Sequence, residues 1–501
     1  MTDNLFQRFV HAAADPDKTF IISPGHRTIS FRDAFGAAAR FAHVLAAHGV
    51  KPGDRVAAQV EKSPEALFLY LACLRAGAVY LPLNTDYTAN ELSYFAADAV
   101  PRVFVCAEKN LERIAAAVPG VELLTLSDDG RSGTLAAEAV TAASDFTDAD
   151  MSTDDLAALL YTSGTTGRSK GAMLTHGNLI SNAEALKQVW HYSDKDVLLH
   201  ALPIFHTHGL FVATNVSLIS GASMILLPKF DLDAIFRALP DATVMMGVPT
   251  FYTRLLQDRR LTADVTRHVR LFISGSAPLL AETHRQWRDR TGHAILERYG
   301  MTETNMNTSN PYEGARIPGS VGLPLPGVEL RIAGEDGEPV AQGEIGMIEV
   351  RGPNVFKGYW RMPEKTAAEF RADGFFKTGD LGTIDDKGYV HIVGRGKDLI
   401  ISGGLNVYPK EIESLIDELP GVAESAVVGL PHSDFGEGVT AFIVTRKGAR
   451  LTEKDVLNAL GDRLARFKHP KRVIFLDQLP RNTMGKVQKS LMRETFKDLY
   501  G

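Results

Sequence analysis

Helical and extended patterns alternate through the first half of this sequence, and this alternation is what most constrains its fold. The Ala-rich segment 31–48 has the pattern of a helix, with Ser30 and Asp33 spaced as a capping box at its start. Short runs of apolar or β-branched residues, typical of strands, occur at 55–60, 103–106, 156–160 and 224–227. Such alternation predicts an α/β fold in which helices cover largely parallel sheets.

The pattern changes at about Gly319, where short strands punctuated by Gly and Pro predict a β-rich subdomain. A further boundary is expected near Arg395, because the segments after it form an α+β pattern of small-domain size. That unit includes an amphipathic helix predicted over 451–467. We therefore expect a large N-terminal domain, 1–394, and a small mobile C-terminal domain, 395–501.

Length and composition favour a cytoplasmic, soluble protein of ordinary globular type. A chain of 501 residues is too long for one core, and a net charge of −6 provides no basic surface for nucleic acid. The most apolar long stretch, 210–227, is interrupted by polar residues, so a buried helix and strand explain it better than a membrane span. We expect neither nucleic acid nor membrane among the partners.

One loop, 161–171, carries the strongest chemical signal. It follows an apolar strand and combines glycines, hydroxyl side chains and Lys170, which together can form a nest of donors for phosphate oxygens. Its spacing is not that of a Walker A loop. A solvated Ser/Thr/Gly turn is the alternative for a shorter match. The residues that could form such a nest are Thr162, Ser163, Gly164, Thr165, Thr166, Gly167 and Lys170.

Three later segments could complete a nucleotide site. The turn 274–278 follows a predicted strand at 270–273, and the segment 299–303 ends in Glu303, whose carboxylate suits Mg²⁺ beside phosphates. Asp380 could bind ribose hydroxyls, although an exposed turn is the commoner meaning of a Thr-Gly-Asp sequence.

Taken together, these segments resemble the adenylate-forming superfamily of acyl-CoA synthetases, luciferases and peptide-synthetase adenylation domains. The resemblance extends from about residue 25 to 490, and five motifs occur in the family's order: 161–171, 299–303, 378–381, 394–398 and 480–486. One departure is Ser169, where many members have Pro before the loop lysine. The resemblance implies an ATP-dependent acid–thiol ligase that uses Mg²⁺ and coenzyme A.

The resemblance also implies roles for particular residues. Glu303 would bind Mg²⁺, and Asp380 and Arg395 would hold the ribose. The adenine and the α-phosphate would be flanked by Ser276, Ala277, Pro278, Glu297, Arg298, Tyr299, Gly300, Met301 and Thr302.

Lys486 would be the catalytic residue of adenylation, because one mobile cation can hold two anions together as charge moves to pyrophosphate. By resemblance, the C-terminal domain then rotates at the hinge Lys397. The turn of Ser402, Gly403 and Gly404 would arrive to line the channel for the CoA thiol. Acetylation would remove the charge of Lys486, which makes this residue a candidate control point.

Two features concern the acid. His206 is the expected gate between acyl pocket and thiol channel, with His208 as its rival and a plain core histidine as the alternative. Arg254 is either a helix-surface residue in an ion pair or a buried guanidinium that binds a second carboxylate of the substrate.

The segments 247–254 and 298–307 resemble malonyl-CoA synthetases, which favours the second role and places Ser276 and Met306 at the substrate. We therefore expect malonate as the acid, with methylmalonate slower. The alternatives are a short- or medium-chain fatty acid–CoA ligase, an adenylation enzyme that loads a carrier protein, a luciferase-type oxidase and a non-enzymatic binding protein.

Overall fold

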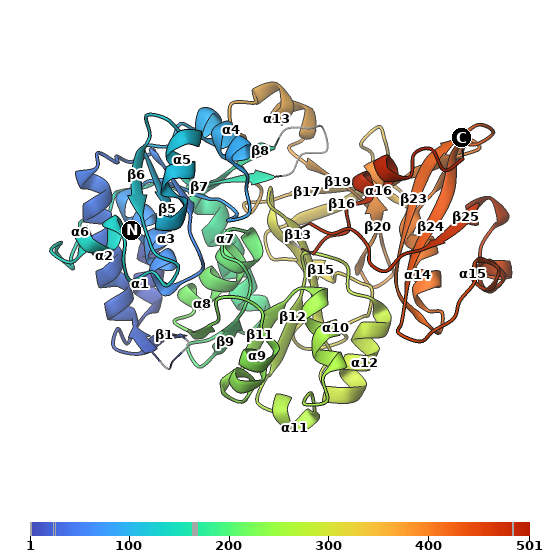
Figure 1. Cartoon of the computed structure of the whole chain (residues 1–501), viewed down its shortest axis with the longest axis horizontal. Coiled ribbons are helices and arrows are strands. Elements are labelled where there is room, and N and C mark those ends of the chain that lie inside the picture. Colours follow the sequence, from blue (N-terminus) through green and yellow to red (C-terminus); the bar gives the residue numbers. More distant parts are fainter. Residues whose placement is uncertain (1–2, 24, 26, 163–168, 483–484, 501) are drawn as a thin grey trace.

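The structure is a computed structural model that describes residues 3–23, 25, 27–162, 169–482 and 485–500 (Figure 1). Its largest sheet has nine strands, parallel at the centre and antiparallel at both edges. Their spatial order is β15 (Leu323–Pro324), β14 (Asn305–Ser309), β13 (Leu296–Met301), β12 (Leu271–Ser274), β11 (Val244–Gly247), β9 (Val197–His200), β10 (Ser223–Leu226), β1 (Thr19–Ser23) and β2 (Arg27–Ser30).

The second sheet has seven strands, and the hairpin of β8 and β7 lies towards one edge of it. Their order is β18 (Gly358–Tyr359), β8 (Lys170–Thr175), β7 (Leu156–Thr162), β4 (Val79–Pro82), β3 (Arg55–Gln59), β5 (Val103–Cys106) and β6 (Glu122–Thr125). The pairs from β7 to β6 are parallel, whereas β18, β8 and β7 are antiparallel.

Helices cover these sheets, as the alternating pattern predicted. They are α1 (Leu5–Ala12), α2 (Phe31–Ala47), α3 (Pro64–Ala76), α4 (Ala89–Ala99), α5 (Leu111–Ala117), α6 (Thr134–Ala139), α7 (His176–Val189), α8 (Asn215–Ile219), α9 (Leu232–Ala238), α10 (Pro249–Gln257), α11 (Ala263–Thr266) and α12 (Ala281–Thr291). The capping box of Ser30 and Asp33 is present at the start of α2. One hydrophobic core takes side chains from both sheets, among them Leu160 and Phe272, which confirms the α/β class.

A third, antiparallel sheet follows, as the Gly- and Pro-rich pattern predicted. It contains β16 (Glu329–Ala333), β17 (Gly346–Arg351), β19 (Phe376–Ile384) and β20 (Val390–Arg395), and α13 (Pro363–Glu369) lies between β17 and β19 in the sequence.

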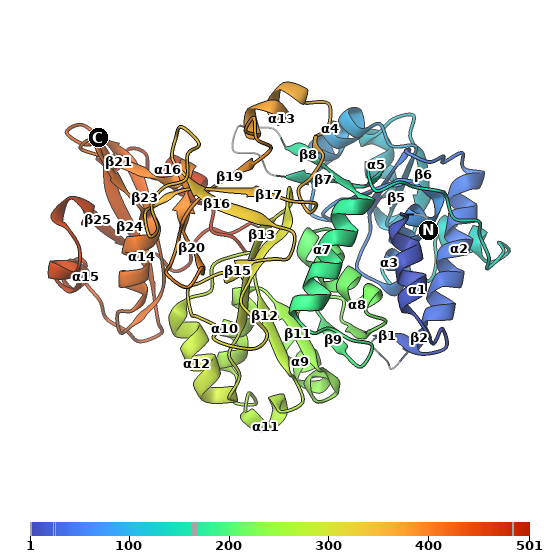
Figure 2. The same cartoon turned by 180° about the vertical axis from the view of Figure 1, so that it is seen from behind.

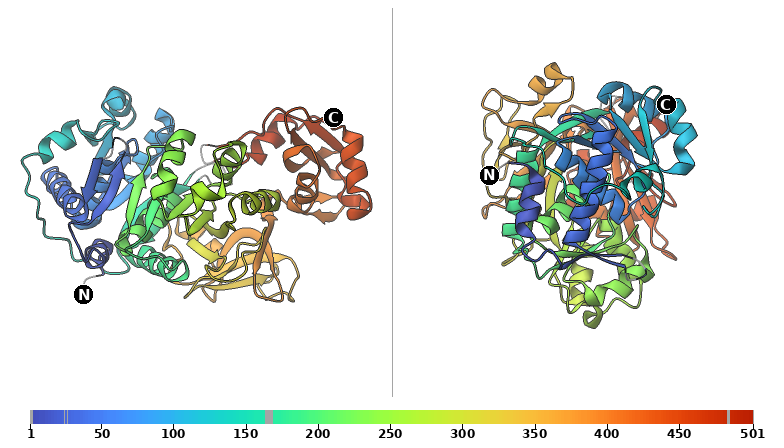
Figure 3. Two further views of the ribbon diagram at one scale, coloured as in Figure 1. Left: turned by 90° about the horizontal axis from the view of Figure 1, so that it is seen from below. Right: turned by 90° about the vertical axis from the view of Figure 1, so that its left-hand side faces the viewer.

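The C-terminal unit has its own sheet and its own hydrophobic clusters. It projects from one end of the larger part (Figure 3). Its elements are β21 (Ile400–Ser402), β22 (Leu405–Val407), α14 (Pro409–Asp417), β23 (Val422–His432), β24 (Gly436–Thr445), α15 (Glu453–Leu460), β25 (Arg472–Phe475) and α16 (Lys489–Thr495). The domain boundary at residue 395 remains a proposal.

Two segments differ from the sequence expectation. The helix predicted over 451–467 ends at Leu460, because Gly461 interrupts it and only short 3₁₀ turns follow. The apolar stretch 210–227 is buried as expected, but its first part belongs to a π-helix, His208–Thr214, that periodicity did not indicate.

Among the helices of the described ranges, none has the length and apolarity needed to span a membrane. The cytoplasmic location stays a prediction.

Candidate active site

The predicted site residues gather where four parallel strands of the nine-stranded sheet end. The strands β9, β11, β12 and β13 end at His200, Gly247, Ser274 and Met301, and the connections after them carry the histidines, α10, Ser276 and Glu303. In open α/β sheets the crevice outside the carboxyl ends of the strands is the usual place for a ligand. Residues far apart in the sequence therefore come together.

The phosphate loop joins β7 to β8, and its two ends are held by neighbouring residues. Thr162 pairs with Lys170 across the hairpin. The hydroxyl of Tyr94 donates to the carbonyl of Ser169 at 2.7 Å. The predicted ligands Ser163, Gly164, Thr165, Thr166 and Gly167 lie outside the described residues. Ser169, which departs from the family pattern, thus still offers its carbonyl to Tyr94.

Lys170 is buried, and its Nζ lies 4.6 Å from the ring centroid of Tyr359. Burial lowers the pKa of Lys170. The same tyrosine donates its hydroxyl proton to Glu303 Oε1 at 3.0 Å. Tyr359, which the sequence analysis did not single out, thus connects the predicted phosphate and metal ligands.

The properties of Glu303 suit a magnesium ligand. Its carboxylate is buried, and burial raises its pKa, so a nearby divalent cation would stabilise the charged form. Within the described ranges, no group of three or more His, Cys, Asp or Glu side chains could hold a metal ion. Mg²⁺ does not need such a group, since one carboxylate and substrate phosphates suffice.

The predicted ribose ligands form a network between two sheets, in which Asp380 and its partner Tyr299 are buried and Arg395 is exposed. The hydroxyl of Tyr299 donates to Asp380 Oδ2 at 2.5 Å, and Arg395 Nε lies 3.0 Å from Oδ1. Asp380 and Arg395 face each other in the register of β19 and β20. Asp380 is therefore a buried strand residue and not the exposed turn residue of the alternative reading.

The segment 276–278 follows β12, which pairs with the β13 strand that carries Tyr299. Ser276 has a φ of +70°, which is uncommon for a residue with a side chain, and its Oγ lies 3.1 Å from His208 Nδ1. Ala277 and Pro278 follow with increasing exposure. Gly300 is required sterically, because a Cβ there would lie 1.8 Å from the Asn305 carbonyl oxygen.

The remaining predicted residues of β13 and β14 are less open to a ligand. Glu297 is buried, with Oε1 3.7 Å from His284 Nδ1, and burial raises its pKa. Met306 is buried too, and its carbonyl accepts a hydrogen bond from Asn182. Met301 and Thr302 are half-buried.

Both predicted histidines lie at the site. His206 is half-buried, and burial together with the cations Lys486 and Arg298 lowers its pKa to about 3, so its imidazole is neutral. His208 is buried and contacts Ser276, while its Nε2 has no hydrogen-bond partner in the part of the chain that the structure describes. Both candidates for the gate remain open.

Lys486 comes from the C-terminal unit and lies near the predicted nucleotide residues. Its side chain is exposed to solvent but crowded by protein atoms, and desolvation with the repulsion of Arg395 and Arg298 lowers its pKa to about 8. Asp380 and Glu303 oppose that shift. Lys486 therefore interacts electrostatically with residues of the predicted ribose, metal and acid sites.

The hinge and thiol-channel residues lie elsewhere. Lys397 is exposed in the 3₁₀ turn Gly396–Asp398, whose Asp398 pairs with Arg493. Gly403 and Gly404 form the turn after β21 with φ of +60° and +77°, and Ser402 is buried beside them. Figure 2 shows β21 far from the phosphate hairpin of β7 and β8.

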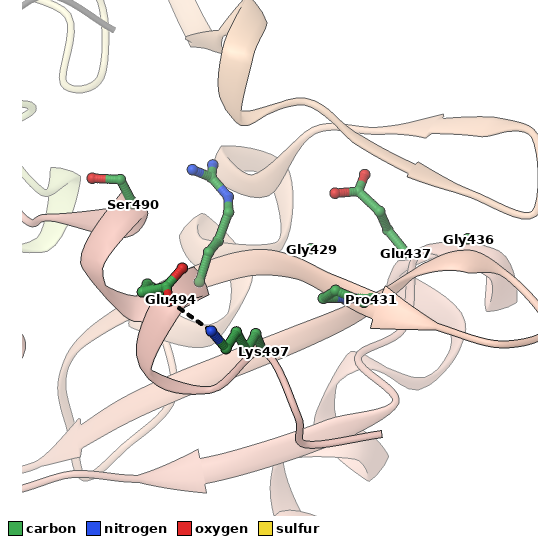
Figure 4. A pocket seen from close by; sticks show the side chains of 8 residues that line it. Gly429, Pro431, Gly436, Glu437, Ser490, Glu494 and Lys497 are labelled. Atoms are coloured by element: carbon green, nitrogen blue, oxygen red, sulfur yellow. Dashed lines mark hydrogen bonds and ion pairs between the residues drawn. The ribbon is translucent and has the colours of Figure 1, made fainter. Parts of the chain in front are cut away.

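The C-terminal unit also has a pocket, shown in Figure 4. It lies between α16 and the facing ends of β23 and β24, and its walls carry the ion pair of Glu494 and Lys497 at 2.8 Å. None of its lining residues was predicted from the sequence to belong to the site.

Arg254 differs from the expectation of a buried guanidinium. Its side chain on α10 is exposed, and its Cζ lies 5.8 Å from the ring centroid of Phe230. Thr250 lies one helical turn earlier on the same face of α10 and is 3.9 Å from a Cβ built on Gly485. Arg254 thus lies on the face of α10 that borders the Lys486 loop, at the rim of the cleft.

The buried guanidinium is that of Arg298, which the sequence placed at the nucleotide. Arg298 is 4% exposed and packs on Gly275, where a Cβ would lie 2.3 Å from its Cζ. Burial lowers its pKa to about 9. Its Nε and Nη2 find no hydrogen-bond acceptor among the described residues. Two adjacent charged residues, Glu297 and Arg298, inside the buried strand β13 are the sequence signal that could have pointed to this buried guanidinium.

This geometry defines the class of the protein. The hairpin predicted to bind phosphate, the buried carboxylates Glu303 and Asp380, and Lys486 of the C-terminal unit come together, as expected of enzymes that join a carboxylate to AMP. A family model described as AMP-binding enzyme matches residues 9–360, and one described as AMP-binding enzyme C-terminal domain matches 411–486. The chain therefore belongs to the AMP-binding enzyme family.

Individual relatives are similar over nearly the whole chain. ATP-bound MatB from Rhodopseudomonas palustris is 61% identical, with a TM-score of 0.98 over 100% of both chains, and its apo form has a TM-score of 0.87. A feruloyl-CoA synthase from Amycolatopsis is 38% identical, covering 94% of this chain and 95% of that protein. A malonate–CoA ligase from Arabidopsis thaliana is 36% identical, covering 90% and 79%.

Proposed function

We propose that this protein is an AMP-forming malonate–CoA ligase. It would convert malonate, ATP and coenzyme A to malonyl-CoA, AMP and pyrophosphate through a malonyl-adenylate, with methylmalonate as a slower substrate. The observation that carries the choice of acid is the buried guanidinium of Arg298 with two unpartnered nitrogens.

An unpaired buried cation is costly, so the site favours a ligand that supplies the missing charge. Malonate has a second carboxylate for this purpose, and arginine can bind a carboxylate through two parallel hydrogen bonds. A fatty acid would place apolar groups there and leave the cation without a partner. Ser276 and His208 add polar groups at the same end of the cleft.

In the adenylation step, one malonate carboxylate oxygen attacks the α-phosphorus of ATP and pyrophosphate leaves. Lys486 would hold both anions in place, which its position between Arg298 and Asp380 supports. Asp380 and Arg395 would orient the ribose, and Lys170 would bind the terminal phosphates. Bound Mg²⁺ would be held by Glu303 and phosphate oxygens, where it neutralises phosphate charge.

In the thioester step, the CoA sulfur attacks the acyl carbon and AMP leaves. We infer that the C-terminal unit turns at Lys397 so that Ser402, Gly403 and Gly404 replace Lys486 at the cleft. The glycines would give the thin pantetheine arm room to approach. The higher TM-score to ATP-bound MatB than to its apo form supports an adenylation-type arrangement here.

The comparisons support malonate as well. Malonate–CoA ligases of Arabidopsis thaliana and Mus musculus are among the relatives, at 36% and 35% identity. A feruloyl-CoA synthase is also among them, so an aromatic acid is the second candidate. Acetylation of Lys486 remains a proposal about control.

The test is acid-dependent CoA consumption with ATP and Mg²⁺, comparing malonate, methylmalonate, acetate, butyrate and ferulate. We expect malonate to lead by about two orders of magnitude in kcat/KM, since an unpaired buried charge costs about 3 kcal/mol. The variant Arg298→Met should lose this preference, and Arg298→Lys should retain part of it. Preference of the wild-type enzyme for butyrate or ferulate would contradict the choice of acid.

A further inference from the structure

A second buried basic side chain lies outside the groups that the proposed reaction uses. Lys62 follows β3 in the seven-stranded sheet, is 9% exposed, and meets His200 at the end of β9 in the other large sheet. Its Nζ lies 2.9 Å from His200 Nδ1 and donates to the His200 carbonyl at 2.8 Å. No ion pair between described side chains includes Lys62. This contact joins the two sheets beside the acid end of the cleft.

The other nitrogen of His200 fixes the direction of these hydrogen bonds. His200 Nε2 lies 2.9 Å from the Gly209 carbonyl oxygen, which can only accept, so Nε2 carries the proton. Burial lowers the pKa of His200 well below its usual value, and the ring is therefore neutral. Nδ1 must then accept from Lys62. His200 in its Nε2-protonated tautomer thus connects Lys62 to Gly209, because Nδ1 accepts from Lys62 and Nε2 donates to the Gly209 carbonyl.

Gly209 lies in the first turn of the π-helix His208–Thr214, and we call the segment 203–209 the histidine loop because it contains His206 and His208. This loop is folded tightly: a Cβ on Gly209 would lie 2.0 Å from the Pro203 carbonyl oxygen. The Gly209 carbonyl also accepts from Thr214 Oγ1 at 2.9 Å. The end of the histidine loop is therefore held by two donors, and His200 is the one that comes from outside the π-helix.

The histidine loop in turn contacts the proposed acid site. His208 lies next to Gly209 and pairs with Ser276, and Ser276 follows the Gly275 that supports Arg298. A change at His200 would shift the Gly209 carbonyl, then His208, and then the wall facing Arg298. The same chain of contacts does not pass through Asp380, Arg395 or Lys170.

We propose that Lys62 and His200 are positioning residues that hold the histidine loop in the arrangement that accepts malonate. This inference rests on the proposed function, since it assigns the histidine loop to the acid side of the cleft. It predicts that loosening the contact weakens malonate binding and widens the range of acids, while ATP binding is retained. A role in folding alone would produce no such split.

The experiment measures malonate-dependent exchange of pyrophosphate into ATP for Lys62→Met, Lys62→Arg, His200→Leu and His200→Gln. We expect Lys62→Met and His200→Leu to raise the KM for malonate about 10- to 100-fold and to change the KM for ATP less than about twofold. Methylmalonate should lose less than malonate. His200→Gln keeps a donor near the position of Nε2, and Lys62→Arg keeps a hydrogen-bond donor near the position of Nζ, so both should lie closer to wild type.

A matched control is Lys187→Met, which removes a lysine that donates to a backbone carbonyl, that of Ile219 at 3.0 Å, away from the cleft. It should leave both KM values unchanged. A wild-type malonate KM in Lys62→Met, or equal rises in both KM values, would overturn the inference. Should Lys62→Met fail to fold, the His200→Leu and His200→Gln pair decides by the same criteria. Absence of malonate-dependent exchange in the wild type would instead refute the proposed function.

Discussion

Gly275 lies directly against the guanidinium of Arg298, so closely that a Cβ on Gly275 would be 2.3 Å from Cζ. The backbone directly after β12 therefore packs against this buried cation and fixes its position. The relationship predicts that the smallest enlargement of Gly275 disturbs the acid site before it disturbs the fold.

Gly275→Ala should lower kcat/KM for malonate about thirtyfold, about 2 kcal/mol, because the added methyl displaces a hydrogen-bonding group. The KM for ATP should change less. Steady-state kinetics with both substrates checks this. Gly36→Ala in α2 is the control, since a Cβ on Gly36 would lie 3.6 Å from Ser144 Cβ, an ordinary van der Waals contact. Unchanged malonate kinetics in Gly275→Ala would show that Arg298 does not bind the acid.

Adenylation should weaken as pH rises through about 8, because the pKa of Lys486 is lowered to about 8 and the lysine is charged only below it. The measurement is kcat/KM for ATP in malonate-dependent pyrophosphate exchange from about pH 6 to about pH 10. Bound phosphates favour the charged lysine, so the profile of kcat should fall at higher pH. In Lys486→Arg, kcat/KM should no longer decline at high pH. A decline that persists in this variant would show that a group other than Lys486 causes it.

Tyr359→Phe should weaken Mg²⁺ binding about 10- to 100-fold, because it removes the hydrogen bond that orients Glu303. The rate as a function of Mg²⁺ concentration at fixed ATP measures this effect. Tyr389→Phe is the matched control, since its hydroxyl donates to the Ala315 carbonyl instead. Equal Mg²⁺ requirements in both variants would argue against Glu303 as the ligand.

Asp380→Asn should raise the KM for ATP about 10- to 100-fold, because a carboxylate that accepts from Tyr299 and pairs with Arg395 loses its charge. If Asp380 binds the ribose, the wild type should discriminate against deoxyribose analogues of ATP and the variant should not. Kinetics with ATP, 2′-deoxy-ATP and 3′-deoxy-ATP tests this. If Asp380→Asn still discriminates against the deoxyribose analogues, Asp380 does not bind the ribose and its role is structural.

The sequence was most informative where local rules decide. The capping box of α2 and the strand β5 depend on neighbouring residues and occur as predicted. The hairpin of β7 and β8 is present where the loop 161–171 was predicted from its composition, and phosphate binding by this loop stays a prediction.

The sequence was less informative where packing decides. Whether Arg254 or Arg298 is buried depends on how α10 and β13 face the sheet, and the expected burial of Arg254 was wrong, because its side chain is exposed. The contact of Lys62 with His200 joins residues 138 positions apart, and no local pattern indicates it. Helix 451–467 was overextended because its apolar spacing continues beyond Gly461.

The unpartnered Arg298 also has a consequence for the lifetime of the protein. A buried charge that only the substrate neutralises makes the empty protein less stable than the loaded one. The acid would then act as a stabilising ligand, and its scarcity would increase the fraction of molecules that unfold and are degraded. Under the proposed function, the abundance of the enzyme would follow the supply of malonate without any dedicated regulator.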